Sequence, residues 1–299
     1  MSEMFSGVKV ITNLDRGIID EIYSAGKIEI FDKRYNLNNQ QNMYLVLKDE
    51  VVDDEGNVTT PTTSSILVRV QGDHLVRLAV NNDTVVSGIR AKNKEQLMAI
   101  DALMDDTVNV VSLTGPAGTG KTLLTLAAAL HKVEQRVYDK IILTRPMTQV
   151  GKHDLGILPG EVDDKFGPYL KNYMCNFEHL FKGRKTVDDM IKFYNMEFMP
   201  LQLIRGASWP NAVIIADEVQ TLNHHEMLTL GTRIGENSKL IIMGDLSQRD
   251  EKIAKDKTGL YHWVNNPAVK ASRLTASINL IKSERSEICR LFANVFEEV

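Results

Sequence analysis

Cysteine is scarce in this chain of 299 residues, with Cys175 and Cys289 far apart and without a metal-type spacing. So few cysteines argue against a disulfide-stapled secreted protein and fit a reducing compartment. The start, MSEMFSGVKV, lacks the basic end and apolar core of a signal peptide. No apolar run approaches the roughly 20 residues that a membrane-spanning helix requires. We therefore expect a soluble, cytoplasmic protein with no membrane partner.

An excess of charge of either sign is also missing. The formal net charge is -4 and the pI is near 6.0, so the composition does not demand a nucleic-acid partner, although a local basic groove is compatible with it. Hydrophobic residues make up 43% and charged residues 25%, as in ordinary globular proteins. A chain of this length suits one large domain with a small companion.

Residues 1–88 contain short apolar runs, several of which alternate with polar residues, and turn-forming segments separate them. This pattern predicts a small β-rich N-terminal domain. A helix-like stretch at 15–23 interrupts it, and the acids and threonines of 49–65 indicate an exposed loop. The expected strands lie at 8–11, 28–30, 43–47, 66–70 and 75–80.

Residues 89–299 have a different hydrophobic pattern, in which near-continuous apolar segments alternate with helix-like stretches. Asn93 is a suitable N-cap for a first helix. The pattern predicts an α/β domain, a parallel sheet with helices on both faces. The expected strands are 108–113, 140–143, 213–216, 240–243 and 274–280, and the expected helices include 123–133, 226–234 and a closing helix at 286–296.

The strongest motif is a GxxxxGK[ST] phosphate loop (P-loop) between an expected strand and an expected helix. Its glycines let backbone N–H groups face phosphate oxygens, and the following helix adds the positive end of its dipole. Lys121 would reach the β and γ phosphates, and the Thr122 hydroxyl would coordinate Mg²⁺. The alternative is a glycine-rich turn without a ligand. The loop consists of Gly115, Pro116, Ala117, Gly118, Thr119, Gly120, Lys121 and Thr122.

Two further expected strands end in polar residues at the same edge of the sheet. After 213–216 come Asp217, a candidate Mg²⁺ ligand, and Glu218, a candidate base for the attacking water. After 240–243 comes Gly-Asp-x-x-Gln, in which Gln248 could sense the γ-phosphate. Strands that simply run into solvent are the alternative for both.

Together these segments resemble the PhoH family of ATPases. The resemblance covers the chain from about Lys92 to Val299, and it implies a RecA-like P-loop domain similar to the first half of superfamily-one helicases, without their second half. The matching segments are GPAGTGKTLLTLAAAL, YDKIILTRPM, VGKHDLGILPGEVDDK, LIRGASWPNAVIIADEVQ, MLTLGTRIGENSKLIIMGD and LSQRD.

The resemblance implies roles for residues outside these strand ends. Gln96 lies where those helicases place an adenine-reading glutamine, and an amide can pair with both N6 and N7 of adenine. Arg145 follows a strand and could face phosphate or a nucleic-acid strand. Arg285, before the closing helix, is the candidate arginine finger, acting on its own γ-phosphate or on a neighbour's. Surface positions are the alternative for each.

Some PhoH proteins carry an N-terminal PIN nuclease domain, which residues 1–88 do not resemble. They look instead like the β-rich region that follows such a domain, so we assign no nuclease activity. Four aromatic residues could stack on bases, with a place in the core or at an interface as the alternative: Tyr169, Tyr173, Tyr194 and Trp209.

We therefore expect an ATPase that uses ATP and Mg²⁺. Its catalytic residues would be Lys121, Glu218, Gln248 and Arg285. Hydrolysis would be coupled to single-stranded RNA or DNA, as in a helicase or translocase, and family resemblance suggests a homo-oligomer, a hexameric ring. Two alternatives stay open. One is a nucleotide-dependent assembly or scaffold module, and the other is a small-molecule kinase, against which the water-activating Glu218 argues.

Overall fold

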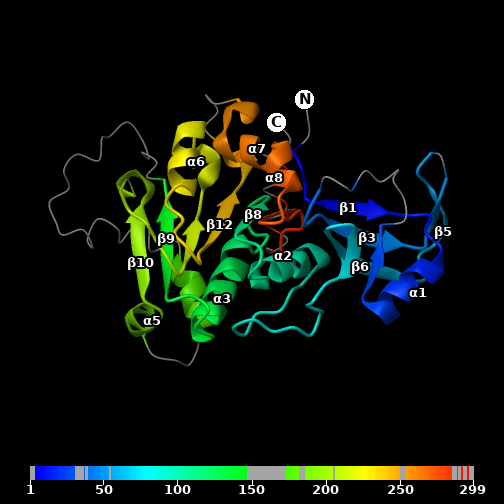
Figure 1. Ribbon diagram of the computed structural model, residues 1–299, viewed down its shortest axis with the longest axis horizontal. Helices are drawn as coiled ribbons and strands as arrows, with labels where there is room; N and C mark the ends of the chain where they lie inside the picture. Colours follow the sequence, from blue (N-terminus) through cyan, green and yellow to red (C-terminus); the bar gives the residue numbers. More distant parts are fainter. Residues whose placement is uncertain are drawn as a thin grey trace.

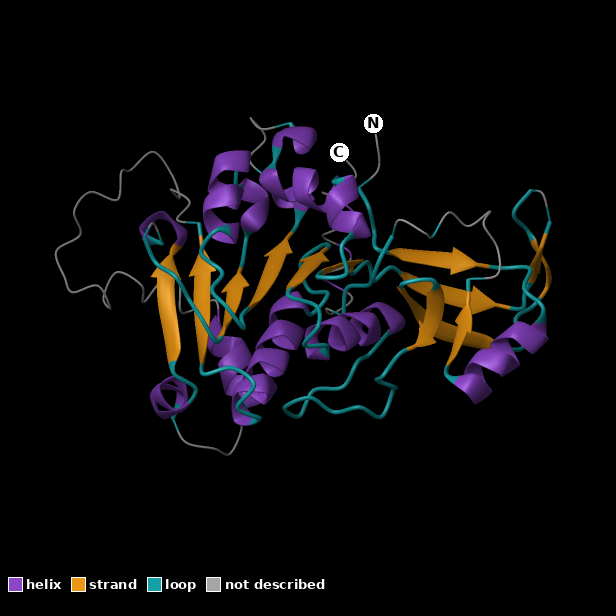
Figure 2. Cartoon of the chain, viewed as in Figure 1, coloured by secondary structure: helices purple, strands orange, loops and turns teal. Residues whose placement is uncertain are grey.

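The computed structural model describes residues 4–30, 37, 40–53, 55–146, 173–181, 186–204, 206–249 and 254–284, together with 288, 291 and 295. These residues form an N-terminal mixed sheet and, beside it, a six-stranded parallel sheet flanked by helices (Figure 1). Figure 2 shows the strands of the larger sheet pointing in one direction between two groups of helices.

The N-terminal sheet has five strands in the order β1-β3-β6-β7-β2. Strand β1 pairs with β3 in parallel, and the other neighbours are antiparallel. Helix α1 (Arg16–Ala25) begins after Asp15, whose carboxylate accepts the Gly17 N–H, and it buries Ile19 and Ile22 in the sheet's own core. The strands are β1 (Val8–Ile11), β2 (Lys27–Glu29), β3 (Tyr44–Lys48), β6 (Ser65–Gln71) and β7 (His74–Arg77).

The expected loop at 49–65 is wrong in part, because it contains the two-stranded hairpin β4 (Val51–Val52) and β5 (Val58–Thr60). Its strands are largely exposed, so they lack the buried alternation that identified the other strands. The Asp53 carboxylate closes the turn by accepting backbone N–H groups from Glu55 and Asn57. Such local side-chain bonds leave no apolar signature.

The larger sheet is parallel throughout, with the strand order β10-β9-β11-β12-β8-β13. This confirms the expected α/β fold of the RecA type. Strand β12 lies between β8, which leads into the phosphate loop, and β11, which leads into the acid pair. The strands are β8 (Val110–Thr114), β9 (Lys140–Arg145), β10 (Met196–Pro200), β11 (Ala212–Ala216), β12 (Lys239–Gly244) and β13 (Thr275–Asn279).

Helices cover both faces of this sheet, because successive side chains on a strand point to opposite faces. On β11, for example, Val213 and Ile215 belong to the cluster that α2 and α3 complete, whereas Ile214 packs with α6 and α7. Both faces of β11 and β12 are therefore buried, and their sequences are nearly continuous apolar runs. The helices are α2 (Lys94–Met104), α3 (Lys121–Glu134), α5 (Val187–Phe193), α6 (His224–Gly231), α7 (Gly259–Asn265) and α8 (Pro267–Ala271).

Several elements were not predicted. The edge strand β10 and the short helices α5, α7 and α8 lack long periodic apolar patterns. Of the expected closing helix, the structure describes only 288, 291 and 295, which are helical. No helix in the described ranges has the length and apolar character to cross a membrane.

The two sheets meet at helix α2. Arg69 on β6 pairs with Asp101 of α2 at 3.1 Å and also with Asp105. The Asp101 carboxylate accepts two more hydrogen bonds, from the Tyr44 hydroxyl at 2.9 Å and from the Ala79 N–H at 3.0 Å. Tyr44 also belongs to the hydrophobic cluster of the parallel sheet. A buried polar cluster and a shared core thus join the N-terminal sheet to the α/β unit.

Candidate functional site

The phosphate loop joins β8 to α3, in the strand-loop-helix context that the sequence predicts. Gly115, Gly118 and Gly120 all have positive φ angles, 129°, 84° and 93°. A Cβ atom at Gly115 would lie 2.0 Å from the Leu280 carbonyl oxygen, so a side chain does not fit there. The loop therefore needs glycine both for its backbone conformation and for its close approach to the chain after β13.

Lys121 begins helix α3, and its side chain turns back over the loop. Its Nζ atom donates to the carbonyl oxygens of Gly115 at 2.5 Å and Pro116 at 2.9 Å. The ammonium group thus lies inside the loop that would surround phosphate oxygens. Anionic oxygens are stronger acceptors for an ammonium group than these carbonyls are.

The acid pair follows β11 directly. The Asp217 N–H donates to the Thr144 carbonyl at the end of β9, and this bond fixes the backbone where the strand stops. Glu218 has a left-handed backbone with φ 57° and ψ 32°, an uncommon conformation for a residue that is not glycine. Its N–H donates to the Asp217 carboxylate at 3.0 Å. The two carboxyl groups are therefore held in a strained turn at the carboxyl edge of the sheet.

Burial raises the pKa of Asp217, and the neighbouring Glu218 charge raises it further. The Arg145 charge and the hydrogen bond from the Tyr173 hydroxyl at 3.1 Å act in the opposite direction. Burial and the charge of Asp217 in turn raise the pKa of Tyr173, so this hydroxyl stays a donor. A cation beside Asp217 would compensate the cost of burying its charge.

Glu218 is held by two partners. Gln220 donates from Nε2 to one carboxylate oxygen at 2.6 Å, and an Arg145 guanidinium nitrogen lies 3.6 Å from the other. The Gln220 Oε1 atom accepts the Asp245 N–H at 3.1 Å, so one buried amide connects the ends of β11 and β12. A Cβ atom at Gly244 would lie 2.9 Å from this Oε1, which explains the glycine before Asp245.

Asp245 is the third acid at this edge. Its Oδ1 atom accepts the Ser247 N–H at 2.9 Å and the Ser247 hydroxyl at 2.6 Å. Its Oδ2 atom is buried and has no hydrogen-bond partner among the described residues. An unsatisfied buried carboxylate oxygen is costly, and hard cations such as Mg²⁺ bind oxygen ligands. Oxygen atoms of Thr122, Asp217 and Asp245 are a donor set that fits this ion.

One cavity of about 280 Å³ brings most of the predicted site residues together. The loop, both acids and Gln248 line it, although they come from three separate segments of the chain. Its lining is Ala117, Gly118, Gly120, Lys121, Thr122, Leu123, Asn176, Asp217, Glu218, Gly244, Asp245 and Gln248.

Gln96 and Arg145 do not line this cavity. Gln96 is buried behind the loop, where its Nε2 donates to the Thr119 carbonyl at 2.9 Å and its Oε1 accepts the Lys92 N–H at 2.8 Å. Both ends of its amide are therefore bonded to the protein backbone. Arg145 lies at the end of β9 against Glu218. Arg285 and the GKHDLGILPG segment lie outside the described residues.

Sequence reasoning missed Asn176 and Gln220. Asn176 comes from a helical stretch at 173–180, far from the motifs in sequence, and no spacing pointed to it. Gln220 stands two residues after Glu218, so the Asp-Glu-x-Gln order was a usable signal. The base-stacking candidates Tyr173, Tyr194 and Trp209 are buried and belong to the core, so the stacking hypothesis is wrong for them. The fourth candidate, Tyr169, lies outside the described residues.

Comparisons with known proteins show the family of this chain. The family model "PhoH-like protein" matches residues 88–297. Protein PhoH2 of Bacillus subtilis is 34% identical over 299 residues, covering 98% of this chain and 64% of the relative. Protein PhoH2 of Thermobispora bispora is 37% identical over 239 residues, covering 80% of this chain and 54% of the relative. The chain thus spans about half to two thirds of the length of these relatives.

The solved structures that resemble the fold are more distant. The Pif1 helicase from Candida albicans has a TM-score of 0.36 at 16% identity, covering 69% of this chain and 43% of that one. The Hef helicase domain of Pyrococcus furiosus has a TM-score of 0.36 at 14% identity, covering 64% of this chain and 38% of that one.

Proposed function

Because this chain belongs to the family of PhoH-like proteins, we propose that it binds ATP with Mg²⁺ and hydrolyses it to ADP and phosphate. The observation that carries the proposal is the single cavity lined by the phosphate loop, the acid pair and Gln248. A phosphate loop alone also suits a kinase. An acid next to the Mg²⁺ ligand, held where water can reach it, favours hydrolysis.

The loop would bind the β and γ phosphates through its backbone N–H groups and the N-terminus of α3. Lys121 would exchange its bonds to the carbonyls of Gly115 and Pro116 for bonds to phosphate oxygens. Thr122, Asp217 and Asp245 would hold Mg²⁺. When bound, this ion offsets the charge that develops on the transferred phosphoryl group.

Glu218 would orient the attacking water and accept its proton. Gln220 and Arg145 are the residues that fix its carboxylate, and neither lines the cavity. Gln248 lines the cavity with its exposed side chain and would contact the γ-phosphate from the end of β12.

Gln96 keeps its proposed role in adenine recognition, with one condition. To pair with adenine, its amide has to give up the bond to the Lys92 N–H, to the Thr119 carbonyl, or to both. Adenine binding would therefore be linked to the position of the phosphate loop.

We further propose that hydrolysis is coupled to single-stranded RNA or DNA, in a cytoplasmic homo-oligomer. The Gly-Asp-x-x-Gln element and the family membership support this coupling. A hexameric ring in which Arg285 reaches a neighbour's γ-phosphate would complete the site, because a single RecA-like domain leaves one side of that phosphate open. A nucleotide-dependent scaffold is the second candidate.

The proposal is tested by measuring phosphate release from ATP with Mg²⁺, first alone and then with single-stranded RNA or DNA. Hydrolysis that either polymer stimulates is the expected result. Hydrolysis without stimulation would favour the scaffold. Transfer of phosphate to a small molecule, with no release to water, would contradict the ATPase assignment.

A further inference from the structure

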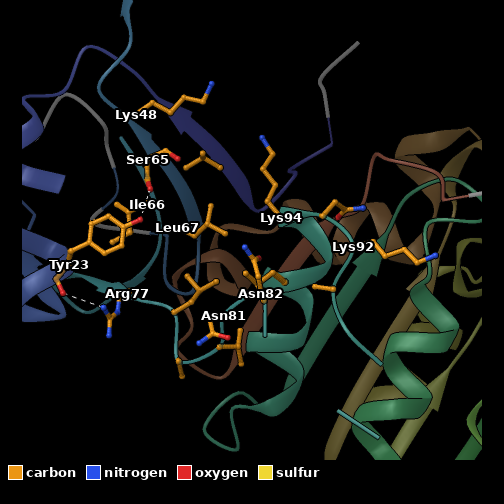
Figure 3. Close-up of a pocket in the computed structure, with 17 residues that line it drawn as sticks. Tyr23, Lys48, Ser65, Ile66, Leu67, Arg77, Asn81, Asn82, Lys92 and Lys94 are labelled. Atoms are coloured by element: carbon orange, nitrogen blue, oxygen red, sulfur yellow. Dashed lines mark hydrogen bonds between the residues drawn. The ribbon is translucent and has the colours of Figure 1, made fainter. Parts of the chain in front are cut away.

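A second and larger cavity lies where the N-terminal sheet meets helix α2 (Figure 3). We call it the junction groove. Its volume is about 930 Å³, more than three times that of the phosphate-loop cavity. One wall comes from strands β3, β6 and β7 with α1, and the other comes from the start of α2 and the segments before it. The polar residues of its lining are Tyr23, Lys48, Ser65, Arg77, Asn81, Asn82, Lys92, Asn93 and Lys94.

The junction groove is positively charged in a protein whose net charge is negative. Among the described residues, four cationic side chains line it, and no Asp or Glu does. Lys48 pairs with Glu50 at 3.0 Å, outside the lining. Among the residues that the structure describes, Arg77, Lys92 and Lys94 have no acidic partner within ion-pair distance. Figure 3 shows Lys48 and Lys94 extending from the two opposite walls.

The rest of the lining suits a nucleotide chain. Tyr23 is 49% exposed, and its hydroxyl donates to the Ser65 carbonyl at 2.8 Å, so its ring is held in place at the wall. Arg77 donates to the Tyr23 carbonyl at 3.2 Å, which places a guanidinium group beside this aromatic residue. Cations that follow a backbone and an aromatic ring on which a base can stack are the elements of single-strand recognition.

Two chains of hydrogen bonds lead from the junction groove to the phosphate loop. In the first, Gln96 accepts the Lys92 N–H at 2.8 Å and donates to the Thr119 carbonyl at 2.9 Å. In the second, the Asn93 amide donates to the Glu284 carboxylate at 2.8 Å, and the Glu284 N–H donates to the Gly118 carbonyl at 2.9 Å. A displacement of 92–93 would therefore strain or break the bonds to both loop residues.

We propose that the junction groove binds the backbone of a single-stranded nucleic acid, and that Gln96 and Glu284 link its occupancy to the phosphate loop. The inference rests on the proposed nucleic-acid-coupled ATPase and adds to it the location of the polymer site. Phosphates lie along the cations of the two walls, and a base stacks on Tyr23. An acidic peptide is the competing ligand of similar charge, and it lacks bases to stack.

The test measures binding of the full chain to fluorescent single-stranded RNA and DNA of about 16 nucleotides. Fluorescence anisotropy reports the binding at salt concentrations from roughly 50 to 200 mM. One variant carries Arg77→Gln, Lys92→Gln and Lys94→Gln. Its control carries Lys27→Gln, Lys192→Gln and Lys257→Gln, three exposed lysines outside the junction groove. Both variants lose the same formal charge.

We expect the groove variant to bind about tenfold more weakly or worse at the higher salt, with a log–log salt slope smaller by about two, because each lost phosphate contact removes about 0.7 from the slope. The control should keep the parent slope to within about half a unit. Tyr23→Leu should weaken binding by about fivefold or more without changing the slope, because stacking contributes about 1–3 kcal/mol per base. Glu284→Ala should bind the polymer like the parent but lose part of the stimulation of ATP hydrolysis, because it breaks the chain through Asn93 and leaves the chain through Gln96 in place.

If the parent binds and the groove variant and the control bind equally well, the polymer lies elsewhere and this inference fails while the proposed function stands. If the parent binds neither polymer but hydrolyses ATP, both the groove site and the nucleic-acid coupling are contradicted. If Tyr23→Leu binds like the parent, no base stacks there and the competing acidic-peptide ligand gains support. If Glu284→Ala is stimulated like the parent, the link through Glu284 is refuted.

Discussion

Replacing Asp101 with alanine should destabilise the protein strongly, although Asp101 lies outside the phosphate-loop cavity. The Asp101 side chain is only 4% exposed and accepts hydrogen bonds from Arg69, Tyr44 and the Ala79 N–H. Its loss takes one of two carboxylate partners from the buried Arg69 guanidinium, and it leaves the buried Tyr44 hydroxyl and the Ala79 N–H without their acceptor. Removing one partner of a buried ion pair typically costs about 3–5 kcal/mol.

This loss is large beside the roughly 5–15 kcal/mol by which domains are usually stable. Urea unfolding followed by circular dichroism, at constant protein concentration and pH 7, measures it. Asp20→Ala is the matched control, because Asp20 pairs with Arg16 on an exposed helix face at 3.7 Å. Exposed pairs contribute about 0–1 kcal/mol, so the control should unfold almost like the parent.

A double-mutant cycle separates the ion pair from the loss of volume. Arg69→Met combined with Asp101→Leu removes both charges, and it should cost less than the sum of the two single changes, by about 1 kcal/mol or more. Equal unfolding free energies for Asp101→Ala and Asp20→Ala, or strict additivity in the cycle, would refute the claim that this cluster joins the two sheets.

Three further predictions concern the site and its surroundings. Glu218→Gln should keep Mg²⁺-ATP bound yet slow phosphate release by about 10²-fold or more, and normal turnover by this variant would show that another residue is the base. Asp217→Asn should instead raise the Mg²⁺ concentration that is needed for half-maximal hydrolysis. Burial lowers the pKa of Lys239 to about 7, so between pH 7 and 10.5 the unfolded chain binds a proton that the folded chain lacks. The parent should therefore gain stability over Lys239→Met as pH rises through this window, by up to about 1.4 kcal/mol per unit, and a pH-independent difference in urea unfolding would contradict it. Mixing inactive Lys121→Ala and Arg285→Ala subunits should restore ATP hydrolysis if Arg285 acts on a neighbour, and no recovery in assembled mixtures would argue for action within one subunit.

The parts of the fold that the sequence predicts are those whose signal is local. Strands β8, β11 and β12 are buried on both faces, so they appear as continuous apolar runs that are easy to recognise. Each ends directly at a motif, and parallel strands bring their carboxyl ends to one edge. The meeting of Lys121, Glu218 and Gln248 in one cavity therefore follows from the order of motifs and the expected topology.

The parts that could not be predicted depend on contacts between distant segments. Strand β10 is a partly exposed edge strand ending in Pro200, so it shows neither a buried run nor a clear alternation. The position of Gln96 at the start of α2 is a local feature, but the hydrogen bond from its side-chain amide to the Thr119 carbonyl spans 23 residues of sequence. The Arg69 and Asp101 cluster likewise joins two units whose relative placement no spacing encodes.

The sharpest test of the proposed ATPase site compares phosphate release from ATP by the purified parent and by Lys121→Ala, with Mg²⁺ and saturating single-stranded RNA or DNA. The Lys121 Nζ atom donates to the Gly115 and Pro116 carbonyls inside the loop. Circular dichroism and the melting temperature establish that the variant is folded, as we expect. We expect the parent to hydrolyse ATP and the variant to have lost this activity. A folded variant that hydrolyses ATP at near the parent rate, or a parent that releases no phosphate from ATP, would contradict it.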